Sequence, residues 1–143
     1  MKNAYKITDR IVKIEAALLH GDGPTFKKAL NISPNSFCEK ESRNHVSFGL
    51  FDFRVEQPKT VARLWNELPH DEPMRCFTPG YRIEFCTKVG LILKSAICWE
   101  CNWIEVLPNG KEKSEWYSFN GESEVALELL SNLRVSCKRC IEI

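Results

Sequence analysis

The stretch from residue 81 to residue 119 constrains the fold of this chain more than any other part of its sequence. In 81–85 apolar residues alternate with charged ones, which is the period of a β-strand with one buried face. Turn-forming residues follow at 88–90 and again at 108–110, and a long apolar run, 91–106, lies between these turns. Because tight turns join antiparallel neighbours, the sequence predicts an antiparallel sheet built from consecutive hairpins.

Three further segments have the periodicity of amphipathic helices. Near the N-terminus Thr8 can act as an N-cap, and Gly21 follows the apolar stripe as a stop. In the middle of the chain Pro58 stands at the first helical position, and near the C-terminus Ser123 can cap a leucine-rich helix. The three apolar stripes are Ile11, Ile14 and Leu18; Val61, Leu64, Trp65 and Leu68; and Ala126, Leu129, Leu130 and Leu133.

These elements together predict an α+β fold, in which N-terminal, middle and C-terminal helices pack on an antiparallel, meandering sheet. Another strand is expected within 45–55, where aromatic and branched residues occupy both alternating positions. Segments 31–44 and 69–80 are rich in turn-forming residues and are expected to be loops. No linker divides the chain, so residues 1–143 are expected to form a single domain.

Charge and hydropathy argue against several classes of protein. The chain has 20 Lys and Arg against 19 Asp and Glu, so it lacks the basic excess of a nucleic-acid-binding protein. The apolar stretch 7–19 is interrupted by charged residues and resembles neither a signal peptide nor a membrane span. Seven cysteines, an odd number, fit reduced thiols better than a disulfide framework, so we expect a cytoplasmic protein.

The cysteines form two CxxC pairs, Cys98/Cys101 and Cys137/Cys140. If the chain turns at 88–90, the residue numbers of two paired positions in the hairpin add up to about 178. This register brings Cys76 beside Cys101. Cys76, Cys98 and Cys101 should therefore lie together, while Cys86, near the turn, should stand apart. A closed zinc site would need a fourth ligand, from Cys137, Cys140, Cys38 or a histidine.

We favour packing over metal for these thiols, because unpaired cysteine is among the most buried residue types. No metal or other cofactor is therefore predicted; if a metal is bound, zinc on Cys76, Cys98 and Cys101 is the alternative. Thiol–disulfide catalysis is the weaker alternative, because a redox CxxC usually has its first thiol at a helix N-terminus, where its pKa is lowered.

Other catalytic constellations are absent from the sequence. The three histidines are scattered (His20, His45 and His70), and there is no GxSxG, P-loop or GxGxxG motif. Trp99 and Trp103 would share one face of a regular strand, where Trp65 and Trp116 could meet them. Such a group belongs more often to a core than to a ligand site, but an exposed aromatic patch here would indicate an interface.

The pattern C-x-x-P-x-Y-x-I-x-F, which begins at Cys76, is followed by C-x-x-C-N at Cys98 and by the leucine-rich C-terminal segment. In these features the chain resembles a loose group of small, mostly uncharacterised bacterial cytosolic proteins over about residues 74–134. Many small proteins of this kind are encoded beside polymorphic toxins, and the resemblance therefore implies a toxin-neutralising role. Phe77 stands where the group has a histidine, which argues against an inherited metal site.

The leading hypothesis is a non-catalytic protein-binding protein, most concretely a bacterial immunity protein that neutralises a cognate protein toxin. Loops 31–44 and 69–80 are the candidate contact segments. A zinc-binding domain built on Cys76, Cys98 and Cys101 is the alternative, and a thiol oxidoreductase is a third. None of these hypotheses involves nucleic acid or a membrane.

Overall fold

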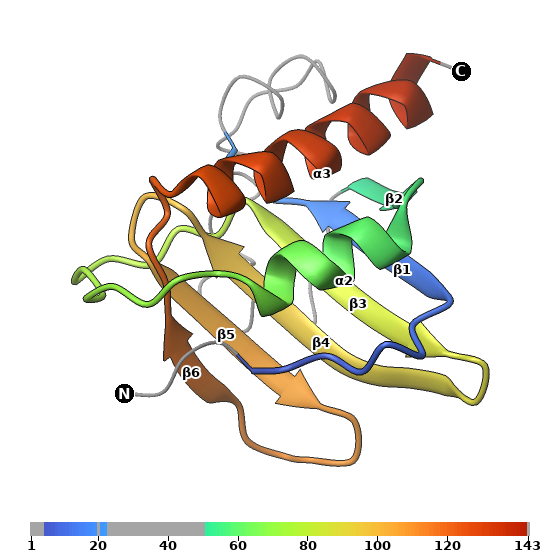
Figure 1. Ribbon diagram of the computed structural model, residues 1–143, viewed down its shortest axis with the longest axis horizontal. Coiled ribbons are helices and arrows are strands. Elements are labelled where there is room, and N and C mark those ends of the chain that lie inside the picture. The colour runs from blue at the N-terminus through green and yellow to red at the C-terminus, as the bar shows by residue number, and fades with distance from the viewer. Residues whose placement is uncertain (1–4, 20, 23–50, 143) are drawn as a thin grey trace.

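The computed structural model describes residues 5–19, 21–22 and 51–142, which contain an open antiparallel sheet (Figure 1). The order of its six strands is β2-β1-β3-β4-β5-β6. Helices α2 (Pro58–Asn66) and α3 (Glu124–Glu142) lie across one face of this sheet (Figure 1). The strands are β1 (Lys13–Leu18), β2 (Phe51–Arg54), β3 (Tyr81–Thr87), β4 (Gly90–Cys98), β5 (Trp103–Pro108) and β6 (Glu115–Ser118).

The predicted hairpins are confirmed in β3 to β6. β3 pairs with β4 in the expected register, with Tyr81 opposite Ile97 and Phe85 opposite Leu93. A bulge shifts the register after Phe85, next to the turn that Gly90 closes at a φ of 139°. β4 then pairs with β5, and β5 with β6, in the same antiparallel sense. Local alternation and turn chemistry were sufficient to predict the pairing of these four strands.

The predicted N-terminal helix is wrong, because Lys13–Leu18 forms strand β1. Ile14 and Leu18, four residues apart, lie on one face of a helix and also on one face of a strand, so their spacing fits both structures. The tertiary structure selects the strand, since β1 lies between β2 and β3 and is hydrogen-bonded to both. Thr8 caps no helix; its Oγ1 accepts a hydrogen bond from the Arg10 N–H in a local turn.

The predicted meander also needs correction, because β2 and β3, which are consecutive in sequence, are not neighbours in the sheet. β1 inserts between β2 and β3, so two strands that flank α2 in sequence are separated by a third. At the end of β1, the backbone passes so close to the 78–79 backbone that a Cβ on Gly21 would lie 2.3 Å from the Thr78 carbonyl oxygen. This close approach, and not a helix stop, accounts for Gly21.

The other two predicted helices are confirmed. Pro58 begins α2, and the Ser123 hydroxyl accepts a hydrogen bond from the Ala126 N–H at the start of α3. α2 buries Trp65 completely, with its ring 5.0 Å from that of Phe85 on β3. The hydrophobic core therefore lies between the two helices and one face of the sheet. The opposite face of β4, β5 and β6 carries Cys98, Trp103 and Trp116.

Candidate functional site

Three of the cysteines gather where the segment 69–80 meets the turn between β4 and β5. The Sγ atoms of Cys76 and Cys101 are 2.8 Å apart. Cys76 is exposed and Cys101 is buried, as is Cys98 at the end of β4. Cys86 lies near the other end of β3, opposite Lys13 and Leu91. The predicted approach of Cys76 to Cys101, and the separation of Cys86, are confirmed.

The pKa values of Cys76 and Cys101 are raised, which limits the chemistry open to these two thiols. Burial raises the pKa of Cys101, and the neighbouring Cys98 thiol adds to that increase. The hydrogen bond to Cys101 raises the pKa of Cys76, and the charge of Glu100 acts in the same direction. Both thiols are therefore protonated at neutral pH, whereas the attacking thiol of a redox catalyst needs a lowered pKa.

The geometry of the thiol cluster gives the zinc alternative no support. Within the described ranges 5–19, 21–22 and 51–142, no group of three or more His, Cys, Asp and Glu side chains is arranged to hold a metal ion. Cys137 is buried in the core beside Asp22, and Cys140 is exposed on α3. Cys38, His20 and His45 lie outside the described residues, as does the predicted loop 31–44.

An aromatic patch adjoins the thiol cluster on the sheet face opposite α2 and α3. We define this patch as Met74, Phe77, Trp103 and Trp116. The Trp116 ring contacts two other rings edge to face, with centroids 5.0 Å from Phe77 and 5.5 Å from Trp103. Met74 is 55% exposed and Trp116 is 43% exposed. Large apolar side chains are thus presented to solvent together, which is typical of an interaction surface.

Hydrogen bonds to the β4–β5 turn hold the 69–80 segment in this position. The Met74 N–H donates to the Cys101 carbonyl at 2.9 Å, and the Trp103 indole N–H donates to the Met74 carbonyl. Asn102, in the left-handed region at a φ of 59°, donates its amide to the Glu72 carbonyl and accepts from the Gly121 N–H. Hydrogen bonds to backbone groups therefore hold the patch in place.

Glu105 lies directly beside the patch on the same sheet face, opposite Trp116 in the register of β5 and β6. Burial raises the pKa of this carboxyl, and a hydrogen bond from Ser114 opposes the increase. A partly buried carboxylate among indole rings supplies one polar acceptor next to an apolar surface.

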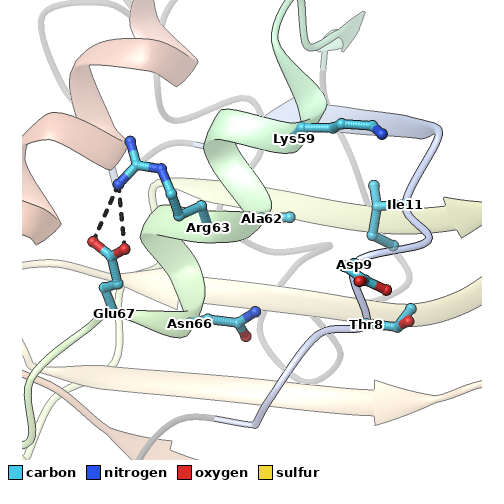
Figure 2. Close-up of a pocket in the computed structure, with 8 residues that line it drawn as sticks. All are labelled: Thr8, Asp9, Ile11, Lys59, Ala62, Arg63, Asn66 and Glu67. Carbon is cyan, nitrogen blue, oxygen red and sulfur yellow. Dashed lines mark hydrogen bonds and ion pairs between the residues drawn. The ribbon is translucent and has the colours of Figure 1, made fainter.

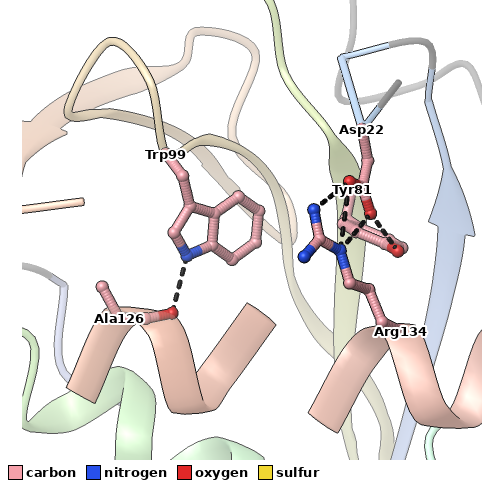
Figure 3. A network of polar contacts seen from close by, with 5 residues as sticks. All are labelled: Asp22, Tyr81, Trp99, Ala126 and Arg134. Carbon is pink, nitrogen blue, oxygen red and sulfur yellow. Dashed lines mark hydrogen bonds and ion pairs between the residues drawn. The ribbon is translucent and has the colours of Figure 1, made fainter. Parts of the chain in front are cut away.

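The four tryptophans do not form the single group that a regular strand would predict. Trp99 lies on the helix side, where its indole N–H donates to the Ala126 carbonyl at 2.7 Å (Figure 3). Trp103 lies on the opposite face, because the β4–β5 turn separates the two residues. Trp65 belongs to the core. Only Trp103 and Trp116 remain available for an interaction surface.

A polar network lies under α3, at the opposite side of the sheet from the patch. Asp22, which is 4% exposed, accepts hydrogen bonds from the Tyr81 hydroxyl at 2.6 Å and from the Arg134 guanidinium (Figure 3). Burial, with the Asp22 charge, raises the pKa of Tyr81. A cavity of only about 150 Å³ adjoins this network. Since the Asp22 oxygens are already hydrogen-bonded, the network is best explained as a structural link between α3 and the sheet.

A groove runs between the segment 8–12, α2 and the β3–β4 turn. It consists of two adjoining cavities of about 460 and 530 Å³ that share Thr8, Asp9, Ile11 and Lys59. Figure 2 shows the residues that line the first of these cavities. Arg63 on its wall is ion-paired with Glu67 at 3.2 Å. Sequence reasoning missed this groove because it placed the residues from Thr8 onward in a helix. Its charged side chains are exposed, as in most solvated surfaces.

His70, the one histidine among the described residues, is exposed. No helix of the described residues is long and apolar enough to cross a membrane. Comparison with protein families, curated proteins and solved structures finds no match to this chain.

Proposed function

We propose that this protein is a non-catalytic binding protein that docks a protein partner on the aromatic patch. The observation that carries the proposal is the shared exposure of Met74 and Trp116 beside the rings of Phe77 and Trp103. Tryptophan, other aromatic residues and methionine are enriched in protein interfaces, and tryptophan is prominent among the residues that dominate binding energy.

The position of the patch supports a protein partner over a small molecule. Trp116 lies on β6, an edge strand of the sheet, so the patch borders a strand edge that faces no other strand of the described chain. A partner can there bury apolar side chains against the rings and reach backbone groups on the strand edge. Met74 and Phe77 belong to the segment 69–80 that the sequence suggested as a contact region.

The partner class to test first is a protein toxin, because the chain resembles small bacterial proteins encoded beside toxins. In that role the protein would act as an immunity protein, binding its cognate toxin through an interface of about 800 Å² per partner. Immunity by occlusion needs no catalytic group in the binding protein, only a tight and specific interface.

The experiment is co-expression of the chain with the product of the toxin-like gene nearest to its own, followed by calorimetric measurement of binding. Trp116→Ala and Met74→Ser are expected to weaken binding at least tenfold, since each removes a central contact. The matched controls are Leu127→Ala and Val135→Ala, which alter exposed apolar residues on α3 and should leave the affinity unchanged.

Two outcomes would overturn parts of this proposal. If the two patch variants bind with normal affinity and the α3 controls bind more weakly, the interface lies on the helical face and not on the patch. Absence of any neighbouring toxin that the chain binds or neutralises would reject the immunity role.

A further inference from the structure

Cys76 and Cys101, 25 positions apart in the sequence, are held in direct contact by the backbone around them. The Met74 N–H donates to the Cys101 carbonyl at 2.9 Å, two residues before Cys76. Four residues after Cys76, the Gly80 N–H donates to the Ile97 carbonyl at 2.9 Å. The segment that carries Cys76 is thus anchored on both sides of the thiol, and the contact is a property of the fold.

The sulfur separation distinguishes between the bonds that these two residues can form. Two thiolates on a tetrahedral zinc ion lie about 3.8 Å apart, given zinc–sulfur bonds of about 2.3 Å. A disulfide needs about 2.05 Å. The observed 2.8 Å is already shorter than the zinc arrangement requires, and closing it to a disulfide moves the atoms by less than about 1 Å. Cys98 lies near enough to affect Cys101, but the close sulfur contact belongs to Cys76.

We propose that Cys76 and Cys101 are a reversible disulfide pair that locks the 69–80 segment onto the β4–β5 turn. The exposed Cys76 is the sulfur that a reagent in solution can reach, and the buried Cys101 is the resolving partner. This inference does not depend on the proposed binding function, although Met74 and Phe77 lie in the segment that the bond would hold.

The chemical step is thiol–disulfide exchange with a small disulfide such as oxidised glutathione. The Cys76 thiolate attacks one sulfur of the reagent, so that a mixed disulfide forms and one glutathione thiol leaves. Cys101 then loses its proton and attacks the Cys76 sulfur, which releases the second glutathione. The protein loses two hydrogen atoms in total, and the reagent gains them as two thiols. Reduced glutathione reverses both steps.

The experiment equilibrates the purified chain in glutathione buffers of rising oxidised fraction, alkylates the free thiols in acid and maps the cross-linked peptides. We expect one dominant link, between Cys76 and Cys101, with Cys86 alkylated throughout. The link should disappear in Cys76→Ser and persist in the matched control Cys86→Ser. Oxidation should raise the Tm by roughly 5–10 °C in the unaltered chain, because the bond restricts the unfolded chain, and should leave Tm unchanged in Cys76→Ser.

The rate of closure gives a second readout that does not depend on the stability of any variant. Because both thiols have raised pKa values, the rate should increase about tenfold per pH unit from neutrality upward. Three results would overturn the proposal: no Cys76–Cys101 link at any oxidised fraction, a dominant link to Cys98 or Cys38, or one equivalent of zinc that protects Cys76 and Cys101 from alkylation. None of these measurements uses a partner protein, so their failure is separate from failure of the binding function.

Discussion

The polar network under α3 and the aromatic patch on the opposite face of the sheet differ in how their groups are partnered. In the network, a buried carboxylate is hydrogen-bonded to Tyr81 and Arg134 of the same chain. In the patch, Met74 and Trp116 leave about half of their surface in water. Groups that are satisfied internally stabilise the fold, whereas exposed apolar groups gain stabilisation only from something outside the chain. This difference is the reason why we propose a structural role for the network and a binding role for the patch.

The largest effect is expected from Trp65→Ala, in the hydrophobic core on the helix side of the sheet. Trp65 is completely buried, and its indole N–H donates to the Tyr5 carbonyl. Removing the ring leaves a cavity and an unpaired carbonyl, so the free energy of unfolding should fall by about 3–5 kcal/mol. Urea unfolding measures the change. A loss below about 1 kcal/mol would place Trp65 outside the core.

Asp22→Ala should have the next largest effect, about 2–3 kcal/mol, because it leaves the Tyr81 hydroxyl and Arg134 without their acceptor. This range allows for the exposure of nearly half of the Arg134 side chain, which water can solvate. Asp9→Ala, at an exposed carboxylate, is the matched control. The double variant with Arg134→Ala should cost less than the sum of the single variants, and full additivity would contradict the network.

Alkaline pH should destabilise the fold through a thiol beside the network. Burial raises the pKa of the Cys137 thiol from 9.0 to about 12, with the Asp22 charge acting in the same direction. The folded protein holds the Cys137 proton more tightly than the unfolded chain does. This contribution to stability is therefore complete below about pH 9, and it is lost as the pH rises toward 12. By about pH 10.5, halfway through this window, we expect roughly 2 kcal/mol to be lost. In Cys137→Ala the dependence on pH should be shallower, and an unchanged slope would exclude this thiol.

Trp116→Ala should reduce stability by about 1–2 kcal/mol, because the residue is 43% exposed and therefore buries less area on folding than Trp65 does. Set against Trp65→Ala, this variant compares the patch with the core through one residue type. Urea unfolding of both variants under the same conditions provides the measurement. Losses of equal size would mean that the patch is part of the core and would remove the main support for a docking surface.

The smallest effect is expected from Ser118→Ala, at the register partner of Trp103. The Ser118 hydroxyl is buried and has no hydrogen-bond partner among the described residues. Removing an unsatisfied buried group should leave stability unchanged or raise it by up to about 1 kcal/mol. A clear loss in thermal unfolding would instead show that this hydroxyl is satisfied in solution.

Local sequence signals were sufficient to predict the structure wherever residues close in sequence decide it. The turn at Gly90 and the alternation in 81–85 set the β3–β4 register, and from that register follows the meeting of Cys76 with Cys101. The start of α3 likewise follows from Ser123, whose hydroxyl satisfies a backbone N–H that the helix leaves free. These predictions depend on contacts that are close in sequence or on a single tight turn.

By itself, then, the sequence determined the hairpins of β3 to β6, helices α2 and α3, and the neighbourhood of two thiols. Only the tertiary structure decided that Lys13–Leu18 is a strand, because the hydrogen bonds of β2 and β3 on either side outweigh a helical spacing that fits equally well. It also decided which tryptophans are exposed, since the turn after Cys98 places Trp99 under α3 and Trp103 on the opposite face. Exposure depends on what packs against a residue from distant parts of the chain, and that information is not present in local periodicity.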